Sequence, residues 1–270
     1  HRIRHDISSE PKISIIIPTK NLYEDLRNCI TSIEEKTRYK NYEIIVVNNQ
    51  SEDKQTLEYF EYLKSTNKAR ILDFDKPFNF SAMNNYAVEH AKGEFVLLLN
   101  NDTEVIEKGW LEAMLEQAIV PTVGCVGGLL MYPDGTIQHA GMTIGIGGLN
   151  GTRGIAGHQY KYKPESHLAY LDFPQIIHTV SGVTAACLLV SKSIYNEIGG
   201  MDERLQVAWN DVDFCIRVMN AGYENIYTPY ARLYHYESKT RGFEAIDPIK
   251  RIRDEEEILY FISKWDKILK

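Results

Sequence analysis

Residues 93–102 read Gly-Glu-Phe-Val-Leu-Leu-Leu-Asn-Asn-Asp, an apolar run followed directly by a polar cluster. The apolar residues 95–99 are too few for an amphipathic helix and favour a strand buried on both faces. Such strands lie inside mainly parallel sheets, which bind ligands beyond the carboxyl ends of their strands. Asn100, Asn101 and Asp102 are therefore expected at a ligand-binding edge, although these residues also suit a turn that caps the next helix.

A β-α-β unit is predicted before this stretch. Residues 13–17 form a strand that stops at Pro18 and Thr19, and residues 42–47 form a second strand that stops at Asn48 and Asn49. An apolar stripe at helical spacing separates them: Leu26, Cys29, Ile30 and Ile33. Apolar strands in this order predict a parallel, right-handed crossover. The ends of both strands should then share the sheet edge with Asp102.

Further elements complete a first half of nucleotide-binding α/β type. Residues 69–74 suit a third strand, and a helix that contains Asn84 is expected from 78 to about 90, with Ser81 as its cap. A helix over 110–118 should end before Pro121.

The pattern changes after Cys125. Residues 132–136 suggest a hairpin turn, and the glycine-rich residues 141–165 suggest either a mobile loop over a site or an exposed connection. Gly147 and Gly148 belong to a run that resembles a dinucleotide fingerprint only superficially, because no helical pattern follows. A strand over 184–190 and a short helix over 191–198 come next.

The last third carries two further candidate residues. A helix with Asn210 as N-cap should place Asp211 and Asp213 in its first turn, where carboxylates also favour the helix dipole. Short strands are expected over 224–227 and 231–236, the second with His235, which could be an ordinary hydrogen-bonded histidine. A final helix over 248–270 could pack on the domain, on a partner domain or at a membrane surface.

Composition limits the classes of function. The chain has 270 residues and a formal charge of −7, which disfavours nucleic acid as a partner because phosphate-tracking surfaces need a basic excess. No apolar run approaches the ~20 residues that span a bilayer. The four cysteines form no CxxC pair and suit reduced, buried positions. The chain begins at His1, and we expect it to be part of a longer protein.

Three glycosylation sequons begin at Asn79, Asn101 and Asn150. A glycan at Asn101 would block the predicted site, so the sequence favours a cytoplasmic location. Within the cytoplasm, the protein could act at the inner face of the cell membrane.

The chemistry of these residues suits a diphosphate ligand. Asp102 alone is a weak site for Mg²⁺ or Mn²⁺, but diphosphate oxygens would complete the coordination, and His235 could add a nitrogen ligand that suits Mn²⁺ better. Asp211, at a helix N-terminus beside a cleft, could take the proton of an attacking hydroxyl as a general base.

Taken together, these motifs resemble the family 2 glycosyltransferases, specifically the bacterial branch that builds O-antigen, capsule and rhamnose-containing polysaccharides. The resemblance covers residues 11 to about 240 and rests on five segments in the family's order and spacing: 15–21, 48–51, 98–102, 199–203 and 209–215. It implies a GT-A fold, in which a Rossmann-like, mostly parallel sheet with helices on both faces adjoins a smaller antiparallel region. It also implies inverting transfer from a nucleotide-diphosphate sugar.

The resemblance assigns roles to individual positions. Donor binding falls to Pro18, Thr19, Asn48, Asn49, Asn84, Asn100, Asn101 and Asp102. Asp102 stands in the family's DxD motif and would hold the metal, Mn²⁺ or Mg²⁺, with His235. Asp211 matches the catalytic base. Asn48, Asn100 and Asn210 each replace an acidic residue of the family pattern, which affects the choice of nucleotide base and the affinity for metal.

We therefore predict one glycosyltransferase domain over 1–270, with a donor half (11–125), an acceptor half (126–240) and a C-terminal helix (241–270). Its partners would be a UDP- or dTDP-sugar and a lipid-linked or polymeric saccharide, with peripheral membrane association or further domains of the same chain. Two alternative functions remain. The first is a non-catalytic nucleotide-sugar-binding or scaffolding domain. The second is a sugar nucleotidyltransferase, which normally has a Gly-rich basic loop after the first strand, whereas this chain has Pro-Thr-Lys-Asn at 18–21.

Overall fold

The computed structural model describes residues 2, 4–146, 154–166, 170–237 and 248–269. Its strands are β1 (Ile13–Thr19), β2 (Tyr42–Asn48), β3 (Arg70–Asp73), β4 (Phe95–Leu99), β5 (Thr103–Val105), β6 (Val123–Met131), β7 (Ile137–His139), β8 (Met142–Ile144), β9 (Ala156–His158), β10 (His178–Val180), β11 (Cys187–Ser191) and β12 (Glu224–His235). Its helices are α1 (Tyr23–Lys36), α2 (Lys54–Ser65), α3 (Phe80–His90), α4 (Trp110–Ala118), α5 (Lys192–Glu197), α6 (Asn210–Asn220) and α7 (Pro248–Trp265), with a 3₁₀ helix over Tyr170–Gln175.

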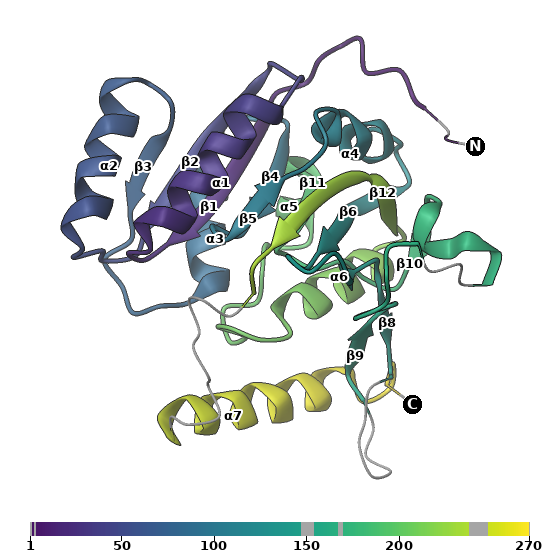
Figure 1. Ribbon diagram of the computed structural model, residues 1–270. Coiled ribbons are helices and arrows are strands. Elements are labelled where there is room, and N and C mark those ends of the chain that lie inside the picture. Colours follow the sequence, from purple (N-terminus) through teal and green to yellow (C-terminus); the bar gives the residue numbers. More distant parts are fainter. Residues whose placement is uncertain (1, 3, 147–153, 167–169, 238–247, 270) are drawn as a thin grey trace.

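One large mixed sheet organises the fold, in the order β10-β12-β6-β11-β4-β1-β2-β3 (Figure 1). Strands β4, β1, β2 and β3 are parallel, whereas β11 joins β4 and β6 in antiparallel pairing. β4 lies near the middle with all its residues buried, as predicted from its apolar run. The α/β class is confirmed, and β8 with β9 forms the smaller antiparallel sheet.

Successive side chains of a strand point to opposite faces of the sheet, so the hydrophobic core has one cluster on each face. In β1, Ile15 and Ile17 join a cluster that includes Leu26 of α1 and Trp110 of α4. Ile16 points to the other face, where the cluster includes residues of α3 and α6. Helices therefore cover both faces and leave the carboxyl ends of the parallel strands open to ligand. The four cysteines are buried and free, as expected.

Two predicted helix caps are wrong. The N-cap of α3 is Asn79, whose side chain accepts from the Ala82 amide, while the Ser81 hydroxyl donates to the Leu205 carbonyl. The N-cap of α6 is Trp209, in a left-handed conformation with φ 62°, rather than Asn210. The cap of α3 is a local contact that lies two residues before the predicted one, at a residue type that N-caps favour. The left-handed Trp209 before α6 has no side-chain cap hydrogen bond, and nothing in the local sequence marks it.

Several elements differ from the predicted set. α2 and β5 were not expected, and the two short strands predicted over 224–236 form a single strand, β12, with a register shift between Thr228 and Arg232. The hairpin turn after β6 is confirmed by its antiparallel pairing with β7. The expected loop over 141–165 contains β8 and β9, while Gly147, Gly148 and the sequon at Asn150 lie outside the described residues.

The C-terminal helix packs on the domain. Phe261 is fully buried, and the helix runs below α6 in Figure 1. Two other apolar residues of this helix, Ile252 and Leu259, are 57% and 67% exposed. Across the described ranges, no helix combines the length and the apolar character needed to span a membrane.

Candidate active site

A cleft of about 490 Å³ opens where β1 and β4 end and α6 begins. Most of the residues predicted from the sequence line it: Pro18, Thr19, Asn100, Asn101, Asp102, Asp211 and His235. The parallel pairing of β1 with β4 explains why the first five meet there, because both strands end at the same edge.

Asp102 is held in place by the segments on either side of it. The Asn101 side-chain amide donates to the Thr19 hydroxyl at 2.8 Å, which joins the ends of β4 and β1. The Asp102 carbonyl accepts from the Tyr236 amide at 3.0 Å. Antiparallel pairing of β5 with β12 places Thr103 opposite His235. Asp102 and His235, far apart in sequence, therefore become neighbours.

The His235 ring is oriented by a residue that the sequence did not single out. The Gln138 side-chain nitrogen faces the His235 carbonyl at 3.3 Å and the Glu237 carboxylate at 3.2 Å, both acceptors. The oxygen of the Gln138 side chain, Oε1, is therefore the atom 2.6 Å from His235 Nδ1. Because this oxygen can only accept a hydrogen bond, Nδ1 carries the proton and donates it. Nε2 is thereby directed at the Asp102 Oδ1 atom, 3.2 Å away.

This pair fits a divalent cation. In a neutral ring, Nε2 carries a lone pair that faces the carboxylate, and a shared cation would relieve the contact between two electron-rich atoms. Adjacent ligands of an octahedral cation with bonds near 2.1 Å lie about 3.0 Å apart, close to the observed separation. Within the described ranges no three His, Cys, Asp or Glu side chains converge, so water or diphosphate would supply the remaining ligands.

Asn100 lies beside the Asp102–His235 pair. With Nδ1 protonated, its side-chain NH₂ donates to His235 Nε2 at 3.1 Å, a hydrogen bond that a bound cation would replace. Its backbone N–H donates to the Ala186 carbonyl at 3.1 Å. An amide is neutral, so Asp102 supplies the carboxylate of the Asn100-Asn101-Asp102 cluster.

Asp211 lies in the first turn of α6, as predicted, and lines the same cleft. Its Oδ2 accepts from the Ala185 amide at 3.2 Å, and its side chain is only partly buried. Trp209, the N-cap of this helix, has a left-handed backbone conformation. A carboxylate fixed at a helix N-terminus and open to a cleft can accept a proton from a bound hydroxyl.

Asp213 has a different role from Asp211, although both occupy the first turn. It is fully buried and pairs with Arg217 at 2.8 Å and Lys264 at 2.6 Å. The Trp265 indole also donates to it at 2.8 Å. Asp213 therefore joins α6 to α7.

Three predicted donor residues are not among the residues that line the cleft in the described structure. Asn48 ends β2 and donates to Asp73 at 2.8 Å. Asn49 donates to the carbonyls of Phe74 and Lys76, and Asn84 donates to the Phe80 carbonyl. A role in donor binding stays a prediction for all three.

The cleft also contains residues that sequence reasoning missed. Gln138, His158 and Glu237 line it, and His158 comes from the glycine-rich region read as a loop over a site. His158 Nδ1 lies 2.8 Å from His139 Nδ1. Burial lowers the pKa of His158, and the charge of Asp211 opposes that shift. Gln138 follows the predicted hairpin turn, and Glu237 lies two residues after His235, but neither position marks a site by itself.

Two solved glycosyltransferases are similar in structure to this chain. A mannosyltransferase from Pyrobaculum calidifontis, solved with GDP-Man and Mn²⁺, aligns with a TM-score of 0.67 at 18% identity over 95% of this chain and 64% of its own. GalNAc-T7, solved with UDP, GalNAc and Mn²⁺, aligns with a TM-score of 0.67 at 14% identity over 87% of this chain and 47% of its own. The fold is GT-A, as the resemblance implied.

The family follows from sequence comparison. The model of the family described as glycosyl transferase family 2 matches residues 14–199, and the chain belongs to this family. It is 43% identical to an uncharacterized Sinorhizobium fredii protein, y4gI, over 98% of this chain and 29% of that protein. It is 36% identical to the O-antigen biosynthesis protein RfbC of Myxococcus xanthus over 91% of this chain and 19% of that protein.

A more distant relative carries a specific activity in its name. The N-acetylglucosaminyl-diphospho-decaprenol L-rhamnosyltransferase of Mycobacterium tuberculosis is 26% identical over 55% of this chain and 49% of its own length. The chain spans less than a third of the length of y4gI and RfbC.

Proposed function

We propose that this chain transfers a sugar from a nucleoside-diphosphate donor to a hydroxyl group, with inversion at the anomeric carbon. The main support for this proposal is that the Asp102–His235 pair and the separate carboxylate of Asp211 line a single cleft. The pair suits a diphosphate bound with a cation, and the separate carboxylate suits a base. The nucleotide, sugar and Mn²⁺ in the two solved GT-A structures support this assignment.

The donor would lie along the open sheet edge. Its diphosphate would reach Asp102, with the Asn100 and Asn101 amides beside it, and its nucleoside would extend past Pro18 and Thr19 toward the end of β2. We keep Asn48, Asn49 and Asn84 as donor residues on that side. UDP- or dTDP-sugars are our proposed donors, and the name of the rhamnosyltransferase relative supports rhamnose as the sugar.

Asp102 and His235 would hold Mn²⁺ or Mg²⁺. When bound, the cation neutralises charge that develops on the leaving diphosphate. The protein's own part is to fix the two ligands, through Gln138 on the ring and the Tyr236 amide on the Asp102 backbone.

The reaction that this geometry favours is a single displacement. The acceptor oxygen forms a bond to the anomeric carbon while its proton passes to the Asp211 carboxylate. The bond from that carbon to the diphosphate oxygen breaks, and its electron pair leaves with the nucleoside diphosphate. Attack from the face opposite the leaving group inverts the configuration, and no covalent enzyme intermediate forms.

The biological setting is also a proposal. RfbC is named for O-antigen biosynthesis, which supports a growing or lipid-linked surface polysaccharide as the acceptor. We place the reaction in the cytoplasm, at the inner face of the membrane, and assign residues 11–125 to the donor and 126–240 to the acceptor. Since the chain spans only part of its relatives, further domains of the same protein would supply the remaining activities.

Neutral amides at Asn48, Asn100 and Asn210 favour one alternative, a domain that binds nucleotide sugars without turnover. Asp102 and Asp211 retain the two carboxylates that transfer needs, so we favour the enzyme.

Thermal unfolding with UDP, dTDP, GDP and CMP, each with and without Mn²⁺, tests the binding step. We expect one nucleotide to stabilise the chain, and only with metal. Transfer of the matching sugar to an oligosaccharide acceptor then separates the enzyme from the binding domain. Binding without turnover across a panel of acceptors would favour the alternative.

A further inference from the structure

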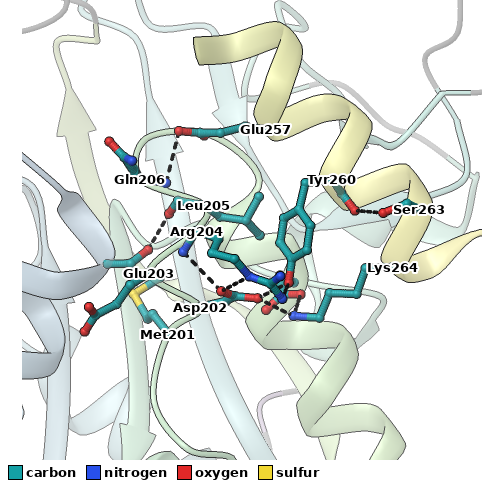
Figure 2. Close-up of polar contacts among 12 residues, drawn as sticks. Met201, Asp202, Glu203, Arg204, Leu205, Gln206, Glu257, Tyr260, Ser263 and Lys264 are labelled. Atoms are coloured by element: carbon teal, nitrogen blue, oxygen red, sulfur yellow. Dashed lines mark hydrogen bonds and ion pairs between the residues drawn. The ribbon is translucent and has the colours of Figure 1, made fainter.

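The C-terminal helix α7 packs against the segment that leads into α6. Phe261 is fully buried in a cluster with Leu205, Val212 and Ile216, so the helix contacts both the segment and the buried face of α6. Figure 2 shows α7 above residues 201–206, with polar side chains between them.

Glu257 on α7 binds the backbone of this segment. Its Oε1 accepts from the Gln206 amide at 3.0 Å, and its Oε2 accepts from the Val207 and Ala208 amides at 3.3 and 2.8 Å. The residue is only 3% exposed. Arg253, which lines the cleft, has its Nε 3.9 Å from Glu257 Oε1. Hydrogen bonds from successive amides to a carboxylate are strong because the acceptor is charged.

Two of the three bound amides, those of Val207 and Ala208, belong to residues that line the cleft. Trp209 and Asn210 continue the lining from there to Asp211. Trp209 holds a left-handed conformation, with φ 62°, that bulky side chains disfavour, so its neighbours must impose it. On the opposite side of the segment, the Phe80 amide donates to the Gln206 carbonyl at 2.8 Å.

A second set of contacts fixes α7 on either side of this segment. Asp202 accepts from the Tyr260 hydroxyl at 2.5 Å and from Lys264 at 2.7 Å (Figure 2). Lys264 also pairs with Asp213 in the first turn of α6. The helix is therefore joined to the segment before Asp211 and to the turn that contains it.

We propose that Glu257 is a positioning residue for Asp211: its carboxylate fixes the 206–208 backbone, imposes the conformation of Trp209 and so aims the proposed base at the acceptor hydroxyl. The inference rests on the proposed function. It assigns to α7 a direct part in the geometry of the reaction, distinct from donor binding at Asp102.

Glu257→Gln tests the proposal, because it keeps the shape but turns an NH₂ group toward at least one backbone donor. A misplacement of the base by about 1 Å costs up to 100-fold in rate. We expect kcat to fall 10–100-fold, while the KM for donor and the Mn²⁺-dependent binding of nucleotide stay within about twofold. Glu256→Gln, an exposed neighbour on the same helix, makes the same charge change and should leave both unchanged.

Hydrogen exchange at the 206–208 amides provides a readout that does not need activity. The amides should be protected in the wild type and should exchange at least tenfold faster in Glu257→Gln. If that variant fails to fold, Glu257→Asp, which keeps the charge on a shorter side chain, should fold with faster exchange and a partial loss of kcat.

Wild-type kcat, a matching fall in donor binding, or unchanged exchange would each overturn the inference. An inactive wild-type chain would instead count against the proposed function, and the exchange comparison would still decide whether Glu257 fixes the segment.

Discussion

The Asp102 Oδ1 atom lies 3.2 Å from His235 Nε2, across the junction of β5 and β12. The two residues come from different halves of the chain, and antiparallel pairing of Thr103 with His235 brings them together. The central sheet thereby brings the segment after β4 and the end of β12 together in one cleft, which Asp211 also lines.

Asp102→Asn removes the carboxylate of the Asp102–His235 pair with little change in side-chain volume. We expect the Mn²⁺-dependent stabilisation by nucleotide to disappear. In the wild type this amounts to about 2.7 kcal/mol when the nucleotide is present at 100 times its Kd. Thermal unfolding with and without Mn²⁺ measures it. Full metal-dependent stabilisation in the variant would show that the cation binds elsewhere.

Gln138→Leu leaves His235 Nδ1 without its acceptor, so the ring is free to rotate or change tautomer. Loss of such a partner typically weakens metal binding 10–100-fold, and we expect that decrease in Mn²⁺ affinity by isothermal titration with nucleotide present. Gln55→Leu, at an exposed position on α2, is the control. Equal affinities for the two variants would rule out a role for Gln138.

Phe261→Ala should destabilise the domain. The side chain is fully buried between α7 and α6, and removal of a buried Phe costs about 3–5 kcal/mol. Leu259→Ala, on the same helix but 67% exposed, should change stability by less than about 0.5 kcal/mol. Urea unfolding compares them. A small effect of Phe261→Ala would mean that α7 contributes little to the stability of the domain.

Asp202 makes the attachment of α7 sensitive to acid. Burial acts to raise the pKa of Asp202, but hydrogen bonds from Lys264 and Tyr260 outweigh it and lower the pKa below its ordinary value. A lowered pKa means that the stabilisation is present above pH ~4, near the ordinary value for Asp, and is lost as the pH falls further.

Urea unfolding of the wild type and Asp202→Asn between pH 6 and pH 2.5 checks this. The wild type should be the more stable at pH 6, and the difference should shrink steadily below pH ~4. A difference that stays constant over the whole range would show that ionisation of Asp202 does not contribute.

Strands β1 to β4 and most helices could be predicted because their signals are local. The buried run 95–99 marked a central strand, and the stripe that includes Leu26 and Ile30 marked α1. The N-cap of α6 could not, because Trp209 is held by a segment on which Glu257 acts from α7, and these partners are distant in sequence. The cap of α3 is a local contact from Asn79 to Ala82, and the hydroxyl of the predicted cap, Ser81, instead donates to Leu205.

The same limit applies to the site. Asp102 and Asp211 follow recognisable local patterns, at the end of a strand and the start of a helix. Gln138 and Glu257 are ordinary polar residues in the sequence. Their roles could be inferred only from the contacts of Gln138 with His235 and of Glu257 with the 206–208 backbone. Ile252 and Leu259 are exposed because Phe261 and Glu257 define the inner face of α7.

The most direct test of the proposed mechanism is the rate of sugar transfer by Asp211→Asn, measured with the donor whose nucleotide binds the wild type. The variant should fold and bind nucleotide with Mn²⁺ as the wild type does, because Asp102 and His235 are unchanged. Loss of a general base lowers the rate by about 10²–10⁴-fold, and we predict a decrease in kcat of that size. Transfer at the wild-type rate by the folded variant would contradict the assignment of Asp211 as the base.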